Sequence, residues 1–252
     1  MRRSRAYRTA AILILAGAGL LLSAVLWAMK AQDFRDVTNL RTLAIALIMY
    51  ADSDYLPPLS SEPGRLMFEM ETLYPEHIPD ALLLLRPADP IRQEVKSADL
   101  TAAFCFENSS YFYIGYMVWD DEMVEAFADA YRKRLEEGLA FDSDLPVDLP
   151  IEKLYRLDEA VRRHGMISYS EWESPKWEHL HRRSEIPTLI ERPHLYPGRF
   201  GLWLFAPVPL SKPILGGTVL YLDGHTEFIR YPGKWPMTEK TISTLTALAA
   251  LD

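Results

Sequence analysis

The N-terminal fifty residues constrain this chain more than any other feature. Four arginines lie within residues 1–8, and no charged side chain occurs over residues 9–29. At about 1.5 Å per residue, a helix over that apolar run is roughly 30 Å long, which matches the hydrocarbon core of a bilayer. We therefore predict a basic cytoplasmic cap over residues 1–8, a transmembrane helix over 9–29 embedded in the lipid bilayer, and a head over 30–252.

The charges around the apolar run predict its orientation. Four arginines precede the run, whereas Lys30 is balanced by Asp33 after it, so we expect the N-terminus in the cytoplasm. A cleaved signal peptide has a shorter apolar region, about 7–15 residues, followed by a small-x-small site, and residues 28–31 lack a good site of that kind. The sequence thus predicts an uncleaved, single-pass signal anchor in the inner (cytoplasmic) membrane, with the head in the periplasm or outside the cell.

The composition limits the partners of the head. The formal net charge of the whole chain is −8, although four of its arginines lie in the cap. A head this acidic is repelled by nucleic acid, so no nucleic-acid partner is expected. Cys105 is the only cysteine, and an intrachain disulfide is therefore excluded.

A second helix is predicted directly after the membrane segment, over about residues 30–51. Apolar side chains recur in it at three- and four-residue spacing, which is typical of a helix with one buried face. The members of this stripe are Phe34, Val37, Leu40, Ala44, Leu47, Ile48 and Ala51. We expect the stripe to pack on a sheet of the head.

The middle of the head is predicted to contain a hairpin and several helices. A short helix is expected around residues 64–74. Residues 100–118 are aromatic and β-prone, and we interpret them as a hairpin with its turn at 107–110. Two inserted helices are then expected around residues 120–165.

Local signals give bounds for those two helices. The first is predicted over residues 121–137, with Asp120 as its N-cap and Gly138 as its C′ residue. The second is predicted over residues 151–164. Residues 141–150, which lie between the two helices, are interpreted as a surface linker.

The clearest strand signal lies near the C-terminus. Residues 218–222 and 225–231 have strand composition, and Asp223-Gly224 between them suits a two-residue type I′ turn. This pattern predicts a β-hairpin.

The last elements complete the expected fold. A further strand is predicted over residues 201–206, and a C-terminal helix over 238–251 with Thr238 as its N-cap. The fold class is therefore α+β, with a long N-terminal helix packed on a small antiparallel sheet and with additional helices.

Two pairs of residues are weak candidates for metal ligands. Asp52 and Asp54 form an Asp-x-Asp pair, but the glycine and distal glutamate of an EF-hand loop are missing. His179 and His181 alternate as two ligands on one strand face would, although their surroundings are strongly charged. Helix termination and solvation explain both pairs more simply, so we predict no bound metal or cofactor.

Asp223, His225 and Glu227 have the composition of an acid–base cluster. However, Asp223 belongs to the predicted turn, and the chain has no Gly-x-Ser-x-Gly elbow and no phosphate-binding glycine-rich loop. A hydrolase would need His225 or His194 beside a carboxylate and a nucleophile. The sequence therefore predicts a protein without catalytic activity.

Several motif segments follow one another along the head. They are residues 39–50, 55–58, 73–80, 110–116, 186–191 and 219–229. The last segment contains Asp223-Gly224-His225-Thr226-Glu227-Phe228. Together these segments resemble the pilin-like proteins related to the major pseudopilin of type II secretion, in particular the divergent planctomycete- and verrucomicrobia-type sets with a C-terminal DGH-x-EF hairpin.

The resemblance implies a fold and a role. The implied fold is a long helix whose outer half packs on a small antiparallel sheet, and the implied partners are other pilin-like or secretion-system subunits. The chain differs from prepilins at residues 8–12, where it lacks the glycine of the peptidase site and the glutamate that follows it. Residues 86–89 also replace the cysteine of the family's CPxD-like segment.

The predicted function is that of a non-enzymatic, membrane-anchored structural or assembly component of a type II secretion or pilus-like system. The alternative is a membrane-tethered extracytoplasmic module that binds a ligand or a metal. The mature N-terminus, the partner and the cargo are not specified by the sequence.

Overall fold

The computed structural model describes residues 17, 19, 38–50, 56–87, 89–97, 101–149, 153–157, 183–196, 200–203, 206–209 and 214–251. Most of the predicted membrane segment, and the metal candidates Asp52, Asp54, His179 and His181, lie outside these residues. Among the helices that the structure does describe, none is long and apolar enough to cross a membrane.

The described chain combines helices with antiparallel strands. Besides the helix over residues 38–50, the helical segments are α2 (Met70–Leu73), η1 (Ala81–Leu84), α3 (Pro90–Ser97), α4 (Ala102–Glu107), α5 (Asp121–Glu136), η3 (Arg183–Glu185) and α7 (Glu239–Leu248). The strands are β1 (Tyr111–Tyr113), β2 (Leu145–Pro146), β3 (Lys153–Leu154), β4 (Pro187–Glu191), β5 (His194–Tyr196), β6 (Phe200–Trp203), β7 (Ala206–Pro209), β8 (Ile214–Tyr221) and β9 (Thr226–Arg230).

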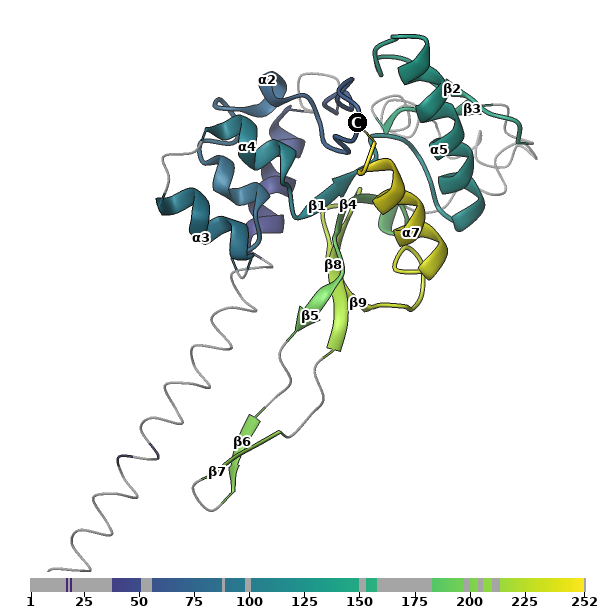
Figure 1. Cartoon of the computed structure of the whole chain (residues 1–252). Helices are drawn as coiled ribbons and strands as arrows, with labels where there is room; N and C mark the ends of the chain where they lie inside the picture. The colour runs from purple at the N-terminus through teal and green to yellow at the C-terminus, as the bar shows by residue number, and fades with distance from the viewer. Residues whose placement is uncertain are drawn as a thin grey trace, which may run out of the picture.

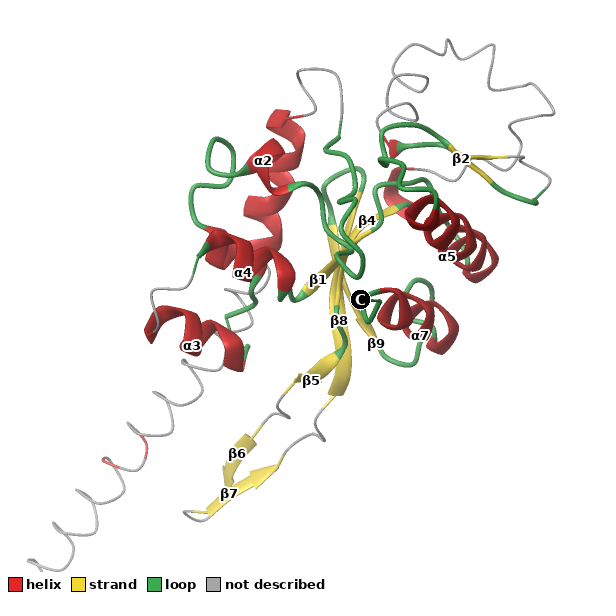
Figure 2. Cartoon of the chain, turned by 45° about the horizontal axis from the view of Figure 1, so that its top comes forward, coloured by secondary structure: helices red, strands yellow, loops and turns green. Residues whose placement is uncertain are grey.

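Helices cover both faces of the central sheet. The helix over residues 38–50 lies with α2, α3 and α4 on one side of the sheet, and α5 and α7 lie on the other (Figure 1, Figure 2). Tyr113, Leu189, Val219 and Leu220 of the sheet are all 1% exposed or less. The protein is therefore a mixed α and β fold of three layers, because the sheet is apolar on both faces and each face needs a cover.

The central sheet is built around β8. One end of β8 pairs with β4 and the other end with β5, while β9 pairs along its opposite edge and β1 extends the sheet beyond β4. All of these pairs are antiparallel. In the described part of the chain, β6 and β7 pair only with each other, and so do β2 and β3.

The helix over residues 38–50 buries a face that differs partly from the predicted stripe. Leu40, Ala44 and Leu47 are buried as expected, and Asn39 and Leu43 join them. Ile48, predicted to be buried, is 57% exposed. The Asn39 side chain donates a hydrogen bond to Leu85 O at 3.3 Å, which places Asn39 in the core and turns Ile48 outward.

The predicted hairpin over residues 100–118 is wrong. Residues 102–107 form α4, and β1 pairs with β4 from far along the chain. Ser109 fixes the connection between them, since its hydroxyl donates to Leu84 O and accepts from Tyr111 N. A short apolar run has no periodicity that distinguishes a strand from a helix. The structure of this segment is therefore determined by its contacts with distant parts of the chain, such as the pairing of β1 with β4.

Three neighbouring predictions also need correction. Only Met70–Leu73 is helical within residues 64–74. Lys153–Leu154 is a strand paired with Leu145–Pro146 and not a helix, while residues 158–164 lie outside the described chain. The linker after α5 is partly core, because Phe141 and Leu145 are buried.

The predicted caps of the long helices are confirmed. Asp120 accepts a hydrogen bond from Met123 N at the start of α5, and Gly138 follows its end with a φ of 64°. Thr238 caps α7 by accepting from Thr241 N. Asp121 then joins the two helices, since its carboxylate accepts hydrogen bonds from the hydroxyls of Thr238 and Thr241.

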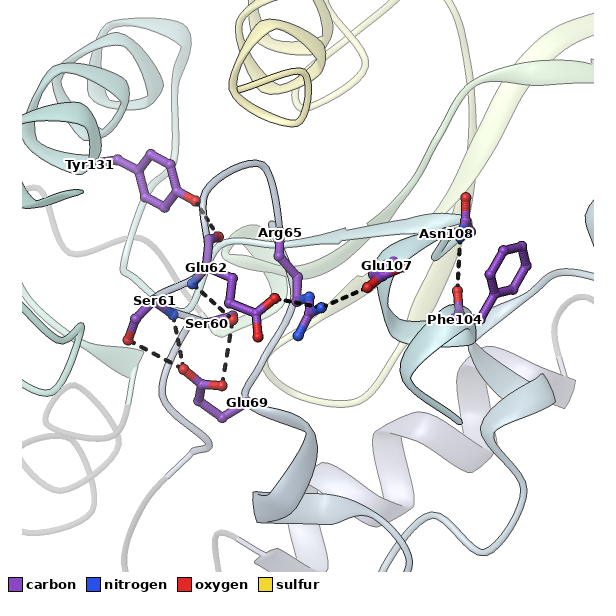
Figure 3. Close-up of polar contacts among 9 residues, drawn as sticks. All are labelled: Ser60, Ser61, Glu62, Arg65, Glu69, Phe104, Glu107, Asn108 and Tyr131. Atoms are coloured by element: carbon purple, nitrogen blue, oxygen red, sulfur yellow. Dashed lines mark hydrogen bonds and ion pairs between the residues drawn. The ribbon is translucent and has the colours of Figure 1, made fainter. Parts of the chain in front are cut away.

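Polar contacts fix the loop over residues 60–69 (Figure 3). The Glu69 carboxylate accepts from Ser61 N at 2.9 Å, and Arg65 pairs with Glu62 at 2.6 Å and with Glu107 of α4 at 3.3 Å. Gly64 lies so close to the C-terminal segment that a Cβ atom there would overlap Leu251 O. The loop therefore contacts both α4 and the C-terminal segment around Leu251.

Candidate functional site

The β8–β9 hairpin carries the DGH-x-EF sequence, and its turn differs from the predicted one. Tyr221 N donates to His225 O, and Gly224 N donates to Tyr221 O, so three residues form the loop. Gly224 has a φ of 86°. The hairpin itself is confirmed, but its turn is of the three-residue kind with glycine in the left-handed conformation, and not a two-residue type I′ turn.

The three predicted acid–base residues have separate local roles. Asp223 Oδ1 accepts from His225 N at 3.1 Å and lies 2.5 Å from His225 Nδ1. The His225 ring stacks on Tyr221 with 4.4 Å between ring centroids. Glu227 is held instead by Lys234 Nζ at 2.7 Å. Asp223 and His225 thus form one pair that stabilises the turn, while Glu227 pairs with Lys234.

An exposed apolar ridge on the helix over residues 38–50 lies next to this turn. The ridge consists of Ile45, Ile48 and Met49, each 57% exposed. A Cβ atom on Gly224 would lie 3.8 Å from Ile48 Cδ1, so the ridge and the turn form one continuous surface. Contiguous apolar patches that are exposed on a protein surface can mark contacts with a partner.

A buried polar cluster lies where β4 passes into β5. The β4–β8 ladder ends at Ile190 opposite Val219, and the β5–β8 ladder begins at His194 opposite Gly216. Three residues therefore face two residues of β8, which is a β-bulge. The Glu191 side chain, 1% exposed, fills the gap by accepting from Thr218 N at 2.7 Å.

His194 lies beside this carboxylate. Its Nδ1 atom is 3.4 Å from Glu191 Oε1. Burial, reinforced by the nearby Arg86 guanidinium, lowers the pKa of His194 to about 4. The imidazole is therefore neutral at neutral pH, and the bulge contains an uncharged histidine next to a buried glutamate.

Ser110 lies beside this cluster, since its carbonyl oxygen accepts a hydrogen bond from Arg192 N at 2.9 Å. Its Oγ atom donates to Asp89 Oδ2 at 2.7 Å and accepts from Arg86 N at 3.0 Å. Hydrolysis would need a histidine beside a carboxylate and a nucleophile. The structure places His194 beside the Glu191 carboxylate. The Ser110 hydroxyl is instead committed to Asp89, which gives it a structural role.

Sequence reasoning missed Glu191 and Asp89. They are far apart in the chain and join the cluster only through the β1–β4 pairing and the turn before α3. Pro193 was the available signal, because a proline inside a strand-like run marks an edge or a bulge.

No metal site is formed by the residues that the structure describes, since they contain no group of three or more His, Cys, Asp or Glu side chains that could hold an ion. No protein-family model matches the chain, and no curated protein or solved structure is significantly similar to it.

Proposed function

We propose that the chain is a membrane-anchored, non-enzymatic subunit with a pseudopilin-like head, which assembles with other subunits of a type II secretion or pilus-like system. The inner membrane would hold it through residues 9–29, with the N-terminus in the cytoplasm. Because the peptidase glycine and the following glutamate are missing, the N-terminus stays in place as a signal anchor.

The observation that carries this proposal is the two-sided helix over residues 38–50. One side, including Leu40, Leu43 and Leu47, is part of the head's core, while the opposite ridge of Ile45, Ile48 and Met49 is exposed. A helix that only supported the head would have a polar outer face. An apolar outer face on a helix that follows the predicted membrane segment in the sequence supports packing against another subunit.

Mass spectrometry of the chain purified from membranes tests the anchor. We expect an intact or Met-trimmed N-terminus. Cleavage at residues 8–12 would instead indicate a processed filament subunit, and loss of residues 1–29 would contradict the anchored state altogether.

Cysteine cross-linking in membranes tests the ridge. Ile45→Cys and Met49→Cys should each give disulfide-linked oligomers on mild oxidation. Asp129→Cys is the matched control, because Asp129 is exposed on α5 in the opposite helical layer, and it should give none. Equal cross-linking at all three positions would show random collision and would remove the support for assembly through the ridge.

A further inference from the structure

Arg192 is a charged residue without the counter-charge that burial requires. It follows β4, and its guanidinium carbon lies 4.6 Å from the centre of the Phe112 ring. The Arg192 Nε atom is buried, and no described residue accepts a hydrogen bond from it. Burial lowers the pKa of this guanidinium, and the nearby charge of Asp89 offsets the effect only in part. Because a guanidinium carries five N–H donors and stays charged, its burial is costly unless an anion accepts from it.

Arg86 shares this environment. Its side chain is 14% exposed, and its Nε atom is also buried without an acceptor among the described residues. Arg86 Nη2 lies 3.9 Å from Asp89 Oδ2, whereas Arg192 forms no ion pair within the described chain. Asp89 Oδ1 already accepts from Ile91 N at 3.1 Å, and its Oδ2 accepts from Ser110 Oγ at 2.7 Å. One carboxylate, with both oxygens engaged, thus has to compensate two guanidinium groups.

The other titratable groups of the cluster do not supply the missing charge. The Glu191 carboxylate accepts from Thr218 N at 2.7 Å and lies 3.4 Å from His194 Nδ1. In the part of the chain that the structure describes, it forms no ion pair with Arg86 or Arg192. His194 is neutral at neutral pH, because burial lowers its pKa to about 4. The two arginines therefore lack one negative charge at contact distance.

Ser110 fixes the backbone positions of both arginines. Its carbonyl oxygen accepts from Arg192 N at 2.9 Å, and its hydroxyl oxygen accepts from Arg86 N at 3.0 Å. Ser110 is buried, and the buried ring of Phe112 supports the Arg192 guanidinium. Binding groups that are held by packing and by backbone hydrogen bonds lose little freedom when a ligand binds. The arrangement is therefore preorganised, and the partly exposed side chains of Arg86 and Asp89 connect it to solvent.

The chemistry of the two side chains indicates the ligand. The ring of Phe112 covers one face of the Arg192 guanidinium, so the N–H donors along the edge of the group remain available. A carboxylate is planar, accepts two such bonds side by side, and brings the single negative charge that the pair lacks. A phosphate group carries about −1.5 to −2 charges, which is more than the site needs. We infer that Arg86 and Arg192 form a binding site for the carboxylate group of a ligand. This inference does not depend on the proposed anchored state.

Thermal unfolding of the full chain in mild detergent tests the site. The probe is sodium acetate, which replaces sodium chloride at constant ionic strength and neutral pH, and the readout is tryptophan fluorescence. A ligand that binds only the folded state raises the unfolding temperature. We expect the unfolding temperature of the native protein to rise with the concentration of acetate. Because acetate also acts on proteins as a general salt, the variants below measure that background.

Two variants separate binding from structure. Arg192→Leu removes an uncompensated charge, so in chloride it should unfold at or above the temperature of the native protein, and acetate should raise this temperature no further than the salt background. Arg86→Gln should weaken the apparent affinity about tenfold or more, since a charge-assisted hydrogen bond is lost. Arg132→Gln is the matched control, because Arg132 forms an exposed ion pair on α5, and it should respond as the native protein does. If Arg192→Leu does not fold, Arg192→Lys takes its place, because it keeps the charge without the planar fork and should lose the response as well.

Two further probes identify the source and the class of the ligand. Glutamate with blocked amino and carboxyl ends carries one side-chain carboxylate, as a polypeptide does. A response to this compound and to acetate means that a free carboxylate suffices, and a response to the blocked glutamate alone assigns the site to a carboxylate of a polypeptide; both results support the inference. A larger response to inorganic phosphate than to either compound overturns the carboxylate assignment. No response, or an equal response in the native protein and in both arginine variants, overturns the site itself.

Discussion

The two β-hairpins near the C-terminus are both antiparallel, but they are paired differently in the described part of the chain. The β8–β9 hairpin has a turn fixed by Asp223, Gly224 and His225, and its strands belong to a sheet covered by helices. The β6–β7 hairpin has no charged residue in its strands, and among the described strands β6 and β7 pair only with each other. The comparison shows that an apolar strand sequence does not by itself decide which strands it pairs with.

The largest expected effect contrasts two leucines of the central sheet. Leu220→Ala in β8 removes a side chain that is 1% exposed, and the free energy of unfolding should fall by about 2–5 kcal/mol. Leu195→Ala in β5, where the side chain is 63% exposed, should change it by less than about 0.5 kcal/mol. Urea unfolding of the full chain in mild detergent measures both. Equal losses would show that the two side chains contribute equally to the folded core.

The next effect concerns the pH dependence of stability, through His194 at the start of β5. The pKa of His194 is lowered to about 4 in the folded state, so between pH 6.5 and 4 the unfolded chain binds a proton that the folded chain does not. Stability is therefore full above pH 6.5 and falls as the pH is lowered, by up to roughly 3 kcal/mol. His194→Gln should flatten this decline. An identical decline in the native protein and the variant would contradict the assignment.

Glu191→Ala tests the bulge itself. It leaves Thr218 N without its acceptor inside the sheet, and we expect a loss of about 1–3 kcal/mol in the free energy of unfolding. Glu76→Ala, at an exposed position, is the matched control and should have no measurable effect. Thermal unfolding followed by circular dichroism distinguishes the two variants. If both unfold at the temperature of the native protein, Glu191 does not stabilise the β4–β8 ladder.

The smallest effect is at the turn of the β8–β9 hairpin. Gly224→Ala places a Cβ atom at a φ of 86°, which costs roughly 1–2 kcal/mol. Space is not the cause, because the nearest atom, Ile48 Cδ1, would be at an ordinary contact distance of 3.8 Å. Gly224→Asn should lose less than the alanine variant, since asparagine tolerates this conformation better. The reverse order would point to a steric cause.

The helix caps, which depend on local chemistry, were predicted correctly, whereas elements that depend on distant partners were not. The caps at Asp120 and Thr238 depend on residues three positions away, and both are confirmed. The segment over residues 102–107 was assigned to the wrong element because its apolar side chains carry no distinguishing period. Glu191 was not predicted as a site residue because its partner Thr218 lies far along the chain. The sequence alone does not show which residues of two distant strands will pair.

The close approach of Gly64 to Leu251 has a consequence for the order in which the head is completed. The loop over residues 60–69 is synthesised early, while the segment against which it lies is synthesised last among the described residues. Most of the sheet and both long helices α5 and α7 are translated in between. Contacts between such distant segments form slowly, since a long chain must first be closed into a loop. The loop over residues 60–69 can therefore make this contact only after α7 has been translated.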